Sequence, residues 1–509
     1  MDEFPIDTTD YSLSDFKRFV KQHPPVVLTG EARGRLARSR AALETILQES
    51  SEPIYGINTG FGKLSQVRIE PDHLARLQLN LIRSHAVGVG PPLELEVVRL
   101  TMLLKLICFS QGHSGVRLIM AELLVACLNH DILACIPSQG SVGASGDLAP
   151  LAHLALALVG EGQVDFKGRQ PLAVEALAAC GLKPLELQAK EGLAMINGTQ
   201  VSTALGLQAA LRLDNLIKVA DIVGALTLDG LLGTPAPFTP QVHALKRHAG
   251  QKDCAANLRT LLEGSTIRES HRHSSHRVQD IYSLRCMPQI HGACRDTIGF
   301  ATSQVVNEAN SVSDNPLIFP DSGEVVSAGH FHGEAVAMAC DMAAIAAAEL
   351  GNISERRIFA LMGGSYGLPP FLVSKAGLNS GLMMFQVTAA ALASENKTLA
   401  HPACVDSIPT GADQEDHVPM ATWAGRKLAS VISNLEQILA LEYLAACQAL
   451  DFREGLHSGP AALGAFRLLR EQVDFLEEDR PMAGDIQGAA ELIGSGAVVA
   501  AVEKVAALK

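Results

Sequence analysis

Apolar residues recur along most of the chain at the spacing of three and four residues that is typical of amphipathic helices. Leu148, Leu151, Leu154 and Leu158 form one such set, because they share one helical face. The same pattern predicts further helices over residues 72–84, 93–128, 200–231, 298–310, 334–354, 376–394 and 420–448. Strand signals are few, and one of the clearest is a small hairpin over residues 164–172 with its turn at Lys167-Gly168. The pattern therefore predicts a mainly α protein with long packed helices and few short strands.

Two loops rich in small residues interrupt the helical pattern. The first, Tyr-Gly-Ile-Asn-Thr-Gly-Phe-Gly at residues 55–62, has no strand pattern before it and neither glycine pattern of a phosphate-binding loop. The second covers residues 136–146 and leads into the helix that contains Leu148. Asp147 is expected to be the N-cap of this helix, and Pro150 falls in its first turn, where proline is tolerated.

Composition and charge narrow the class of protein. Hydrophobic residues make up 48% of the 509 residues and charged residues 19%, which excludes a disordered chain. The net charge of −13 argues against nucleic acid and against an anionic membrane surface as partners. Ten cysteines without a Cys-x-x-Cys pair indicate reduced thiols, and the acidic N-terminal residues lack an apolar signal segment, so we expect a cytoplasmic protein. The uncharged run 376–394 is long enough to span a bilayer, but its polar residues favour a buried core helix.

The segment Gly-Ala-Ser-Gly-Asp at residues 143–147 allows three interpretations. A serine nucleophile of the Gly-x-Ser-x-Gly type fails, because Asp147 stands where the last glycine should be. A tight turn before a capped helix explains the residues without any chemistry. In the third interpretation, the amide nitrogen of Gly146 attacks the carbonyl carbon of Ala144. Loss of two waters, one using the Ser145 hydroxyl, then leaves a five-membered ring with an electrophilic methylidene carbon.

The sequence resembles the aromatic amino acid ammonia-lyases from about residue 25 to the C-terminal region. Gly-Ala-Ser-Gly-Asp-Leu-Ala-Pro-Leu-Ala-His at residues 143–153 is similar to the signature of that family. Further similar segments lie at residues 55–62, 84–90, 197–200, 279–286, 310–316, 331–333 and 414–417. The resemblance implies that Ala144, Ser145 and Gly146 form a 4-methylidene-imidazol-5-one (MIO) group autocatalytically, with no external cofactor and no bound metal. His330 departs from the family, in which asparagine usually precedes the phenylalanine.

The resemblance also assigns roles to single residues. Tyr55 is expected to remove the β-proton of the substrate, Tyr282 to lie near the ring, and Asn197 to hydrogen-bond the ring or the substrate amine. Arg285 is expected to bind the substrate carboxylate with both arms of its guanidinium. The residues expected to line the pocket are Gln279 and Phe331. Each role has an ordinary alternative. For Tyr55 it is a packed tyrosine in a loop, for Asn197 an Asn-Gly turn, and for Arg285 a surface salt bridge. For Gln279 and Phe331 it is simple packing.

His85 and Glu415 resemble the form of the family that acts on histidine. Relatives acting on tyrosine or phenylalanine usually carry His-Leu or Phe-Leu at the position of residues 84–85 and lack this glutamate. A buried imidazole left unpaired costs about 1–3 kcal/mol, and these two side chains can hydrogen-bond its two nitrogens. The expected reaction is the elimination of ammonia from L-histidine to give trans-urocanate, a step of histidine degradation.

Several alternatives remain at this point. One is a tyrosine or phenylalanine ammonia-lyase, or an aminomutase, of the same family. A helical tetramer of the fumarase type is another, although its Ser-Ser-x-Met-Pro-x-Lys-x-Asn signature has no match here. A catalytically dead helical assembly is a third. The cluster His271, His273 and His276 suggests a metal site, but its tight spacing favours a polar loop.

The resemblance finally implies an architecture and an assembly. Residues 1–112 are expected to form a smaller N-terminal domain that carries the loop at 55–62 and the segment at 84–90. Residues 113–509 are expected to form an elongated helical bundle that carries residues 144–146. The implied assembly is a homotetramer whose active sites take residues from more than one subunit, which fits the long apolar helices.

Overall fold

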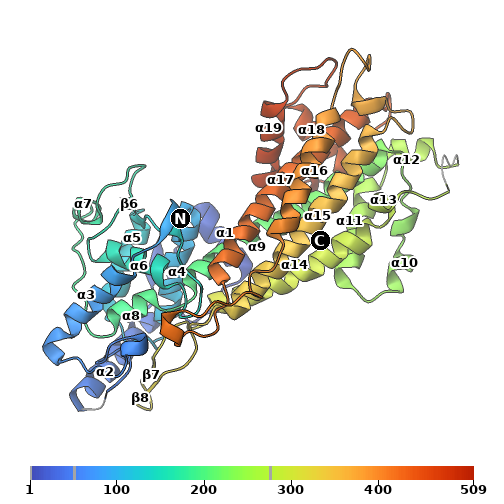
Figure 1. The fold of residues 1–509 in the computed structure, drawn as a ribbon. Helices are drawn as coiled ribbons and strands as arrows, with labels where there is room; N and C mark the ends of the chain where they lie inside the picture. The colour runs from blue at the N-terminus through green and yellow to red at the C-terminus, as the bar shows by residue number, and fades with distance from the viewer. Residues whose placement is uncertain (1–2, 50–52, 274–277) are drawn as a thin grey trace. The chain divides into compact units, whose positions relative to one another are not determined.

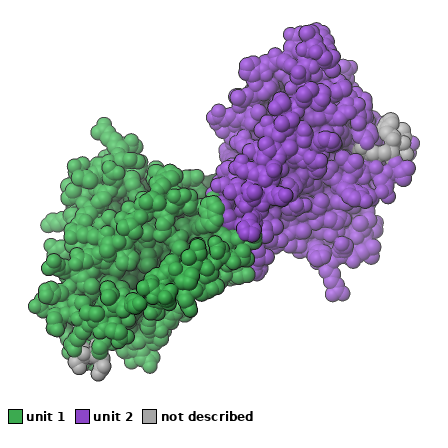
Figure 2. Space-filling view, in the orientation of Figure 1, with its two compact units in different colours: residues 1–208, 301–341, 402–426 green, residues 209–300, 342–401, 427–509 purple. Residues whose placement is uncertain are grey.

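The computed structural model describes residues 3–49, 53–273 and 278–509, and this part of the chain is mainly α-helical (Figure 1). The eight strands that it contains form four two-stranded sheets. The mainly α fold with few short strands is therefore confirmed. The chain divides into two compact units, each assembled from separate segments (Figure 2). Unit 1 comprises residues 1–208, 301–341 and 402–426, and unit 2 comprises residues 209–300, 342–401 and 427–509.

Unit 1 is built from helices in its first 208 residues and from four small sheets. Its helices are α1 (Leu13–Gln22), α2 (Gly30–Glu49), α3 (Leu74–His85), α4 (Leu95–Ser110), α5 (Leu118–Asn129), α6 (Leu148–Leu158), α7 (Ala173–Ala179) and α8 (Glu191–Ile196). Its strand pairs are β1 (Phe4–Ile6) with β2 (Val26–Leu28), β3 (Val89–Pro92) with β5 (Pro137–Gln139), β4 (Leu133–Ala134) with β6 (Val164–Asp165), and β7 (Leu317–Phe319) with β8 (Glu324–Val326). The first pair is parallel and the others are antiparallel. Helix α4 is buried on all sides, as expected for a helix that is apolar around its whole circumference.

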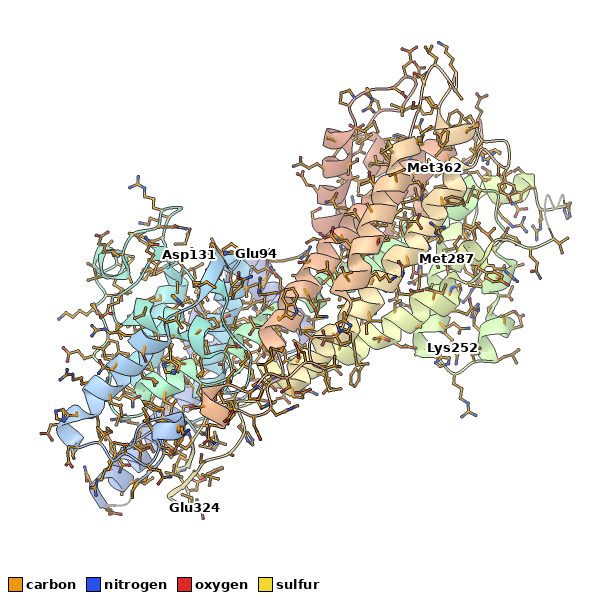
Figure 3. The ribbon with its side chains drawn as sticks, viewed as in Figure 1. Glu94, Asp131, Lys252, Met287, Glu324 and Met362 are labelled. Atoms are coloured by element: carbon orange, nitrogen blue, oxygen red, sulfur yellow. The ribbon has the colours of Figure 1, made fainter. Side chains whose placement is uncertain are left out.

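Unit 2 is a helical unit. The helices that lie entirely within it are α10 (Pro240–Ala244), α11 (Ala249–Leu262), α12 (Thr266–Ser270), α13 (Tyr282–Arg285), α16 (Met383–Leu399), α18 (Pro460–Arg470), α19 (Ala483–Gly494) and α20 (Ala497–Glu503). Four long helices contribute residues to both units: α9 (Gln200–Gly230), α14 (Met287–Ala309), α15 (Glu334–Met362) and α17 (Ala421–Asp451). Met287 and Met362, labelled in Figure 3, mark the first residue of α14 and the last of α15.

Glycines let the long helices approach one another closely within unit 1. A Cβ added at Gly206 of α9 would lie 3.0 Å from Val305 of α14 and 3.4 Å from the sulfur of Cys340 of α15. A Cβ at Gly425 of α17 would lie 2.8 Å from Leu205. Small side chains are therefore needed where these helices cross, which agrees with a composition poor in aromatic residues.

Most predicted helices are present, but several differ in their bounds. The stretch predicted as one helix over 93–128 forms α4 and α5, because Gly112 and Gly115 adopt positive φ values of 80° and 68° between them. The helix predicted from residue 376 begins at Met383, since Gly377 and Gly381 also have positive φ. Helix α14 begins earlier than predicted. The hairpin turn at Lys167 and Gly168 is confirmed, because both residues have positive φ between the paired Phe166 and Arg169.

One helix in the described residues, α15, is long and apolar enough to cross a membrane by length and composition. Within the structure 72% of its apolar window is buried, as in the core helix of a globular unit. All ten cysteines are free thiols.

Candidate active site

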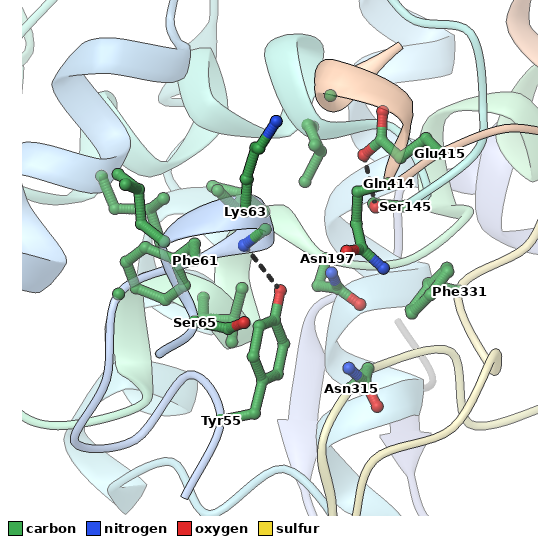
Figure 4. A pocket seen from close by; sticks show the side chains of 18 of the residues that line it. Tyr55, Phe61, Lys63, Ser65, Ser145, Asn197, Asn315, Phe331, Gln414 and Glu415 are labelled. Carbon is green, nitrogen blue, oxygen red and sulfur yellow. Dashed lines mark hydrogen bonds between the residues drawn. The ribbon is translucent and has the colours of Figure 1, made fainter. Parts of the chain in front are cut away.

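Unit 1 contains a cavity of about 1020 Å³ that collects residues from widely separated parts of the chain (Figure 4). Its wall comes from the loop after Ile54, the end of α3, the loop before α6, the end of α8, and residues 315–332 and 411–417. The predicted site residues that line it are Tyr55, His85, Ala144, Ser145, Asn197, Phe331 and Glu415. Gly146 is buried directly beside them.

The loop of residues 143–146 is a tight turn, with Gly143 and Gly146 bridged to each other. Gly146 has a φ of 73°, and a Cβ there would lie 2.2 Å from the carbonyl oxygen of Gly198. A second bridge joins Gly146 to Gly198 itself. Glycine is therefore required at residue 146 both for its conformation and for the close approach of the second chain segment. The turn leads directly into the N-terminus of α6, whose dipole favours negative charge.

Asp147 precedes α6 as predicted, but its side chain does not cap the helix. The carboxylate instead accepts hydrogen bonds from the Ser202 amide (2.7 Å) and hydroxyl (3.0 Å), the Thr422 hydroxyl (2.8 Å) and the Ser141 hydroxyl (3.1 Å). Burial raises the pKa of Asp147, and these hydrogen bonds oppose the rise. Asp147 thus joins α9 and α17 to the tight turn, a role that local sequence rules do not reveal.

Asn197 follows α8 and faces the cavity from a buried position (4% exposed). Its side-chain oxygen has no hydrogen-bond partner among the described residues. Its backbone carbonyl accepts a hydrogen bond of 2.9 Å from Lys105, whose ammonium also binds the carbonyl of Ala194 at 3.1 Å. Burial lowers the pKa of this lysine to about 8. Asn197 has extended backbone angles (φ −86°, ψ 136°) and Gly198 pairs with Gly146, while the side chain of Asn197 is left available to a ligand.

Glu415 lies beside the turn and contacts it directly. The hydroxyl of Ser145 donates to Glu415 Oε1 at 2.8 Å (Figure 4), and the hydroxyl of Thr410 donates to Glu415 Oε2. The Thr410 and Glu415 backbones are also paired, which fixes the loop that carries the carboxylate.

His85 is the last residue of α3 and lines the cavity. Its Nδ1 lies 2.9 Å from the carbonyl oxygen of Leu81 and 3.0 Å from the Ser84 hydroxyl; because the carbonyl can only accept, the tautomer that satisfies this contact carries its proton on Nδ1. In the neutral ring Nε2 therefore retains its lone pair and can accept a hydrogen bond from a ligand.

Tyr55 reaches the cavity from the loop at residues 55–62. The amide of Gly62 donates to the Tyr55 hydroxyl oxygen at 3.4 Å, which fixes the phenol against the same loop (Figure 4). Phe331 and Gln414 lie on the other side of this space, near Ser145. The cavity thus gathers a phenol, an imidazole acceptor, a carboxylate and an unpaired amide oxygen around the tight turn.

The family model described as aromatic amino acid lyase matches residues 11–471 of the chain. The chain belongs to the aromatic amino acid lyase family. Among curated relatives, the histidine ammonia-lyase of Burkholderia cenocepacia is 53% identical over 447 residues, covering 88% of each chain. That of Burkholderia vietnamiensis is 50% identical over 487 residues, covering 96% of each chain.

Solved structures of family members have the same fold. Histidine ammonia-lyase from Trypanosoma cruzi matches with a TM-score of 0.91 and 40% identity, covering 99% of this chain and 95% of that one. Tyrosine aminomutase from Streptomyces globisporus matches with a TM-score of 0.95 and 36% identity over the whole of both chains. The chain is therefore an enzyme of this lyase family.

Three predicted site residues of this lyase, Gln279, Tyr282 and Arg285, lie in unit 2 and do not line the cavity. Tyr282 is 70% exposed on the short helix α13, and the guanidinium of Arg285 lies 4.7 Å from its ring centroid. Arg285 Nε is buried without a hydrogen-bond partner among the described residues. The surface salt bridge considered for Arg285 is therefore not among the contacts of the described residues.

The histidine-rich stretch does not assemble a metal site in the part that the structure describes. Both ring nitrogens of His271 contact backbone carbonyls, of Ile267 at 2.8 Å and Gly233 at 3.2 Å. His276 lies outside the described residues.

A different cluster in unit 2 brings Asp221, Cys254 and His291 together. Arg295 donates to Asp221 at 2.9 Å, and Arg357 donates to His291 Nε2 at 3.2 Å. Two adjacent guanidinium groups disfavour a cation there, and burial keeps the pKa of Cys254 far above its ordinary value. This cluster is better explained as a buried hydrogen-bond network.

Sequence reasoning also missed contributors to the cavity wall. The rings of His332 and His417 stack with centroids 5.9 Å apart, and both residues line the cavity together with Lys63 and Asn315. Each belongs to or adjoins a segment that resembles the family. These segments could therefore have been used to predict the additional residues of the cavity wall. His330, by contrast, is exposed and does not line the cavity.

Proposed function

We propose that this enzyme is a cytoplasmic histidine ammonia-lyase that converts L-histidine to trans-urocanate and ammonia in histidine degradation. The observation that carries the proposal is the presence of His85 and Glu415 in the same cavity wall as Tyr55 and the turn at 144–146. Relatives named histidine ammonia-lyase at 50–53% identity support it.

The residues of the turn fit an MIO group made from Ala144, Ser145 and Gly146. Gly146 has no side chain that would hinder its nitrogen, and the bridged turn brings this residue back toward Gly143. The buried, unpaired oxygen of Asn197 supplies a hydrogen-bond acceptor for a polar group beside the turn. When formed, the MIO group supplies an electrophile that no standard side chain provides. Intact-protein mass spectrometry tests its formation. The expected result is a mass short by two waters, with the loss located at residues 144–146.

Elimination of ammonia requires removal of a weakly acidic β-proton and departure of an amine. Tyr55 is the proposed base, because its hydroxyl is fixed at the cavity wall by the Gly62 amide. Asn197 orients the amine or the ring through its free side-chain oxygen. Negative charge that develops at the turn lies at the N-terminus of α6, whose dipole stabilises it.

Two side chains recognise the imidazole of the substrate. His85 Nε2 accepts the ring N–H, and Glu415 pairs with the other ring nitrogen. A neutral imidazole carries one N–H, so the second bond requires one further proton: on the ring, where the carboxylate accepts it, or on the carboxyl group, which then donates. A leucine in place of His85 would offer neither nitrogen a partner, which argues against tyrosine or phenylalanine as the preferred substrate.

The substrate carboxylate requires a cation, and Arg285 is the proposed one. Because Arg285, Tyr282 and Gln279 do not line the cavity of unit 1, we infer that another copy of the chain supplies them in a homotetramer. Large apolar side chains left exposed in the single chain are consistent with subunit contacts: Phe300, Met338, Ile345, Phe359, Met384 and Trp423.

Product analysis tests the substrate and the reaction together. Purified enzyme is incubated separately with L-histidine, L-tyrosine and L-phenylalanine, and the products are identified by NMR. The proposal expects equimolar trans-urocanate and ammonia from L-histidine, with at most slow turnover of the other two. Formation of a β-amino acid would instead favour an aminomutase. An enzyme with that name, tyrosine aminomutase, is among the similar solved structures.

A further inference from the structure

His153 lies outside the cavity wall but contacts a segment that carries a proposed substrate ligand. It is a half-buried residue of α6, the helix that begins directly after the tight turn. Its Nε2 accepts a hydrogen bond of 3.2 Å from the backbone amide of Gly88. An N–H can only donate, so His153 Nε2 must be unprotonated while this bond exists.

Gly88 lies between His85 and strand β3. His85 is held at the end of α3 through the Leu81 carbonyl, and residues from Val89 onward pair with β5, which leads into the tight turn. The approach at Gly88 is close, since a Cβ there would lie 3.3 Å from His153 Nε2 and 3.2 Å from the Cβ of Pro137. His153 therefore ties the segment after His85 to the helix that carries the reacting turn.

We propose that His153 is a positioning residue, which fixes His85 relative to the turn at 144–146 and so aligns the substrate's imidazole with the reacting centre. The inference rests on the proposed function, in which His85 binds that imidazole. Because His153 touches neither substrate nor turn, it acts through Gly88.

The protonation state of His153 gives this role a pH signature. Burial lowers the pKa of His153 below its ordinary value of 6.5, so Nε2 is free to accept at neutral pH. The elements packed against α6 include α3, α7 and α8. Their titratable groups are Arg76, Arg83, His85, Glu175 and Glu191, and none of them contributes to the shift. Protonation of His153 in acid removes the acceptor and releases Gly88.

The primary test compares His153→Leu with His153→Gln. Leucine keeps much of the volume but removes the acceptor, whereas the glutamine side-chain oxygen can accept from the same amide. We expect His153→Leu to raise the KM for L-histidine about tenfold, as for loss of one hydrogen bond at a partly buried group. His153→Gln should return the KM to within about twofold of wild type. Equal effects of the two variants, or an unchanged KM in His153→Leu, would overturn the proposal.

Two further readouts separate positioning from simple packing. Gly88→Ala crowds the same contact from the other side, because its Cβ would lie 3.3 Å from His153 Nε2, so Gly88→Ala combined with His153→Leu should be no worse than the more severe single variant. Fully additive effects would contradict the proposal. The ratio of the KM value of wild type to that of His153→Gln should rise as the pH falls through the lowered pKa of His153, because only the wild type loses its acceptor by protonation. A wild type that does not convert L-histidine would instead refute the proposed function, which distinguishes the two failures.

Discussion

Replacing His85 with leucine tests the proposed recognition of the imidazole ring. The structure indicates that this change acts on binding rather than on folding. Leu81, whose carbonyl accepts from His85 Nδ1, also accepts a hydrogen bond of 3.0 Å from the Ser84 hydroxyl. The end of α3 therefore keeps a partner when the imidazole is removed. What disappears is the acceptor at Nε2.

The size of the effect follows from the group left unpaired. A ring N–H of the substrate that is enclosed without an acceptor costs about 1–3 kcal/mol. The corresponding loss in kcat/KM for L-histidine is about 5- to 150-fold. The assay is steady-state formation of urocanate by His85→Leu, with L-phenylalanine as a second substrate. Turnover of phenylalanine should not fall, because its ring has no N–H to satisfy.

A matched control is His130→Leu, since His130 is an exposed histidine of unit 1 outside the cavity. This variant should retain wild-type kinetics, and intact mass should confirm the same modification of residues 144–146 in all three proteins. If His85→Leu converts L-histidine within about twofold of wild type, the assignment of His85 as an imidazole ligand is wrong.

Five further variants test other parts of the account. Lys105→Met should remove a rise in stability between pH 8 and 10.5 of up to about 3 kcal/mol, seen by chemical denaturation. The wild type has this rise because burial lowers the folded-state pKa of Lys105 to about 8, so in that window the unfolded chain binds the extra proton. Asn197→Ala should lower kcat about 100-fold while the loss of two waters at residues 144–146 is retained. A kcat near wild type would exclude a role in catalysis. Tyr55→Phe and Arg285→Leu should each be nearly inactive but regain activity when co-expressed, unless one subunit supplies both residues. Gly146→Ala should give an unmodified mass, since a Cβ would lie 2.2 Å from a facing carbonyl oxygen, and a modified mass would contradict the close approach.

The long helices were predictable because their apolar periodicity is local. The breaks were harder, since the separation of α4 from α5 and the late start of α16 depend on glycines with positive φ, such as Gly115 and Gly381. The φ value of a glycine inside a helical pattern cannot be read from the sequence. Asp147 shows the same limit: its place before α6 was readable, but its bonds to residues 202 and 422 depend on long-range packing.

The site residues that lie within short sequence motifs were predictable. Residues from segments as distant as Tyr55 and Glu415 were expected together through resemblance, and both line one cavity. The contact between Ser145 and Glu415 could not be read from spacing, because 270 positions separate them. The placement of Tyr282 and Arg285 in unit 2, where they do not line the cavity, was equally hard to predict, because a short motif does not show which unit its residues join.

The central claim is that the cavity is built around an electrophile that the chain makes from Ala144, Ser145 and Gly146. The most direct measurement is the intact mass of the purified wild-type protein, with peptide mapping of residues 140–150 and Ser145→Ala as the reference. The account predicts a wild-type mass short by two waters, with the loss confined to 144–146 and absent from Ser145→Ala. An unmodified wild-type mass in the purified protein would contradict it.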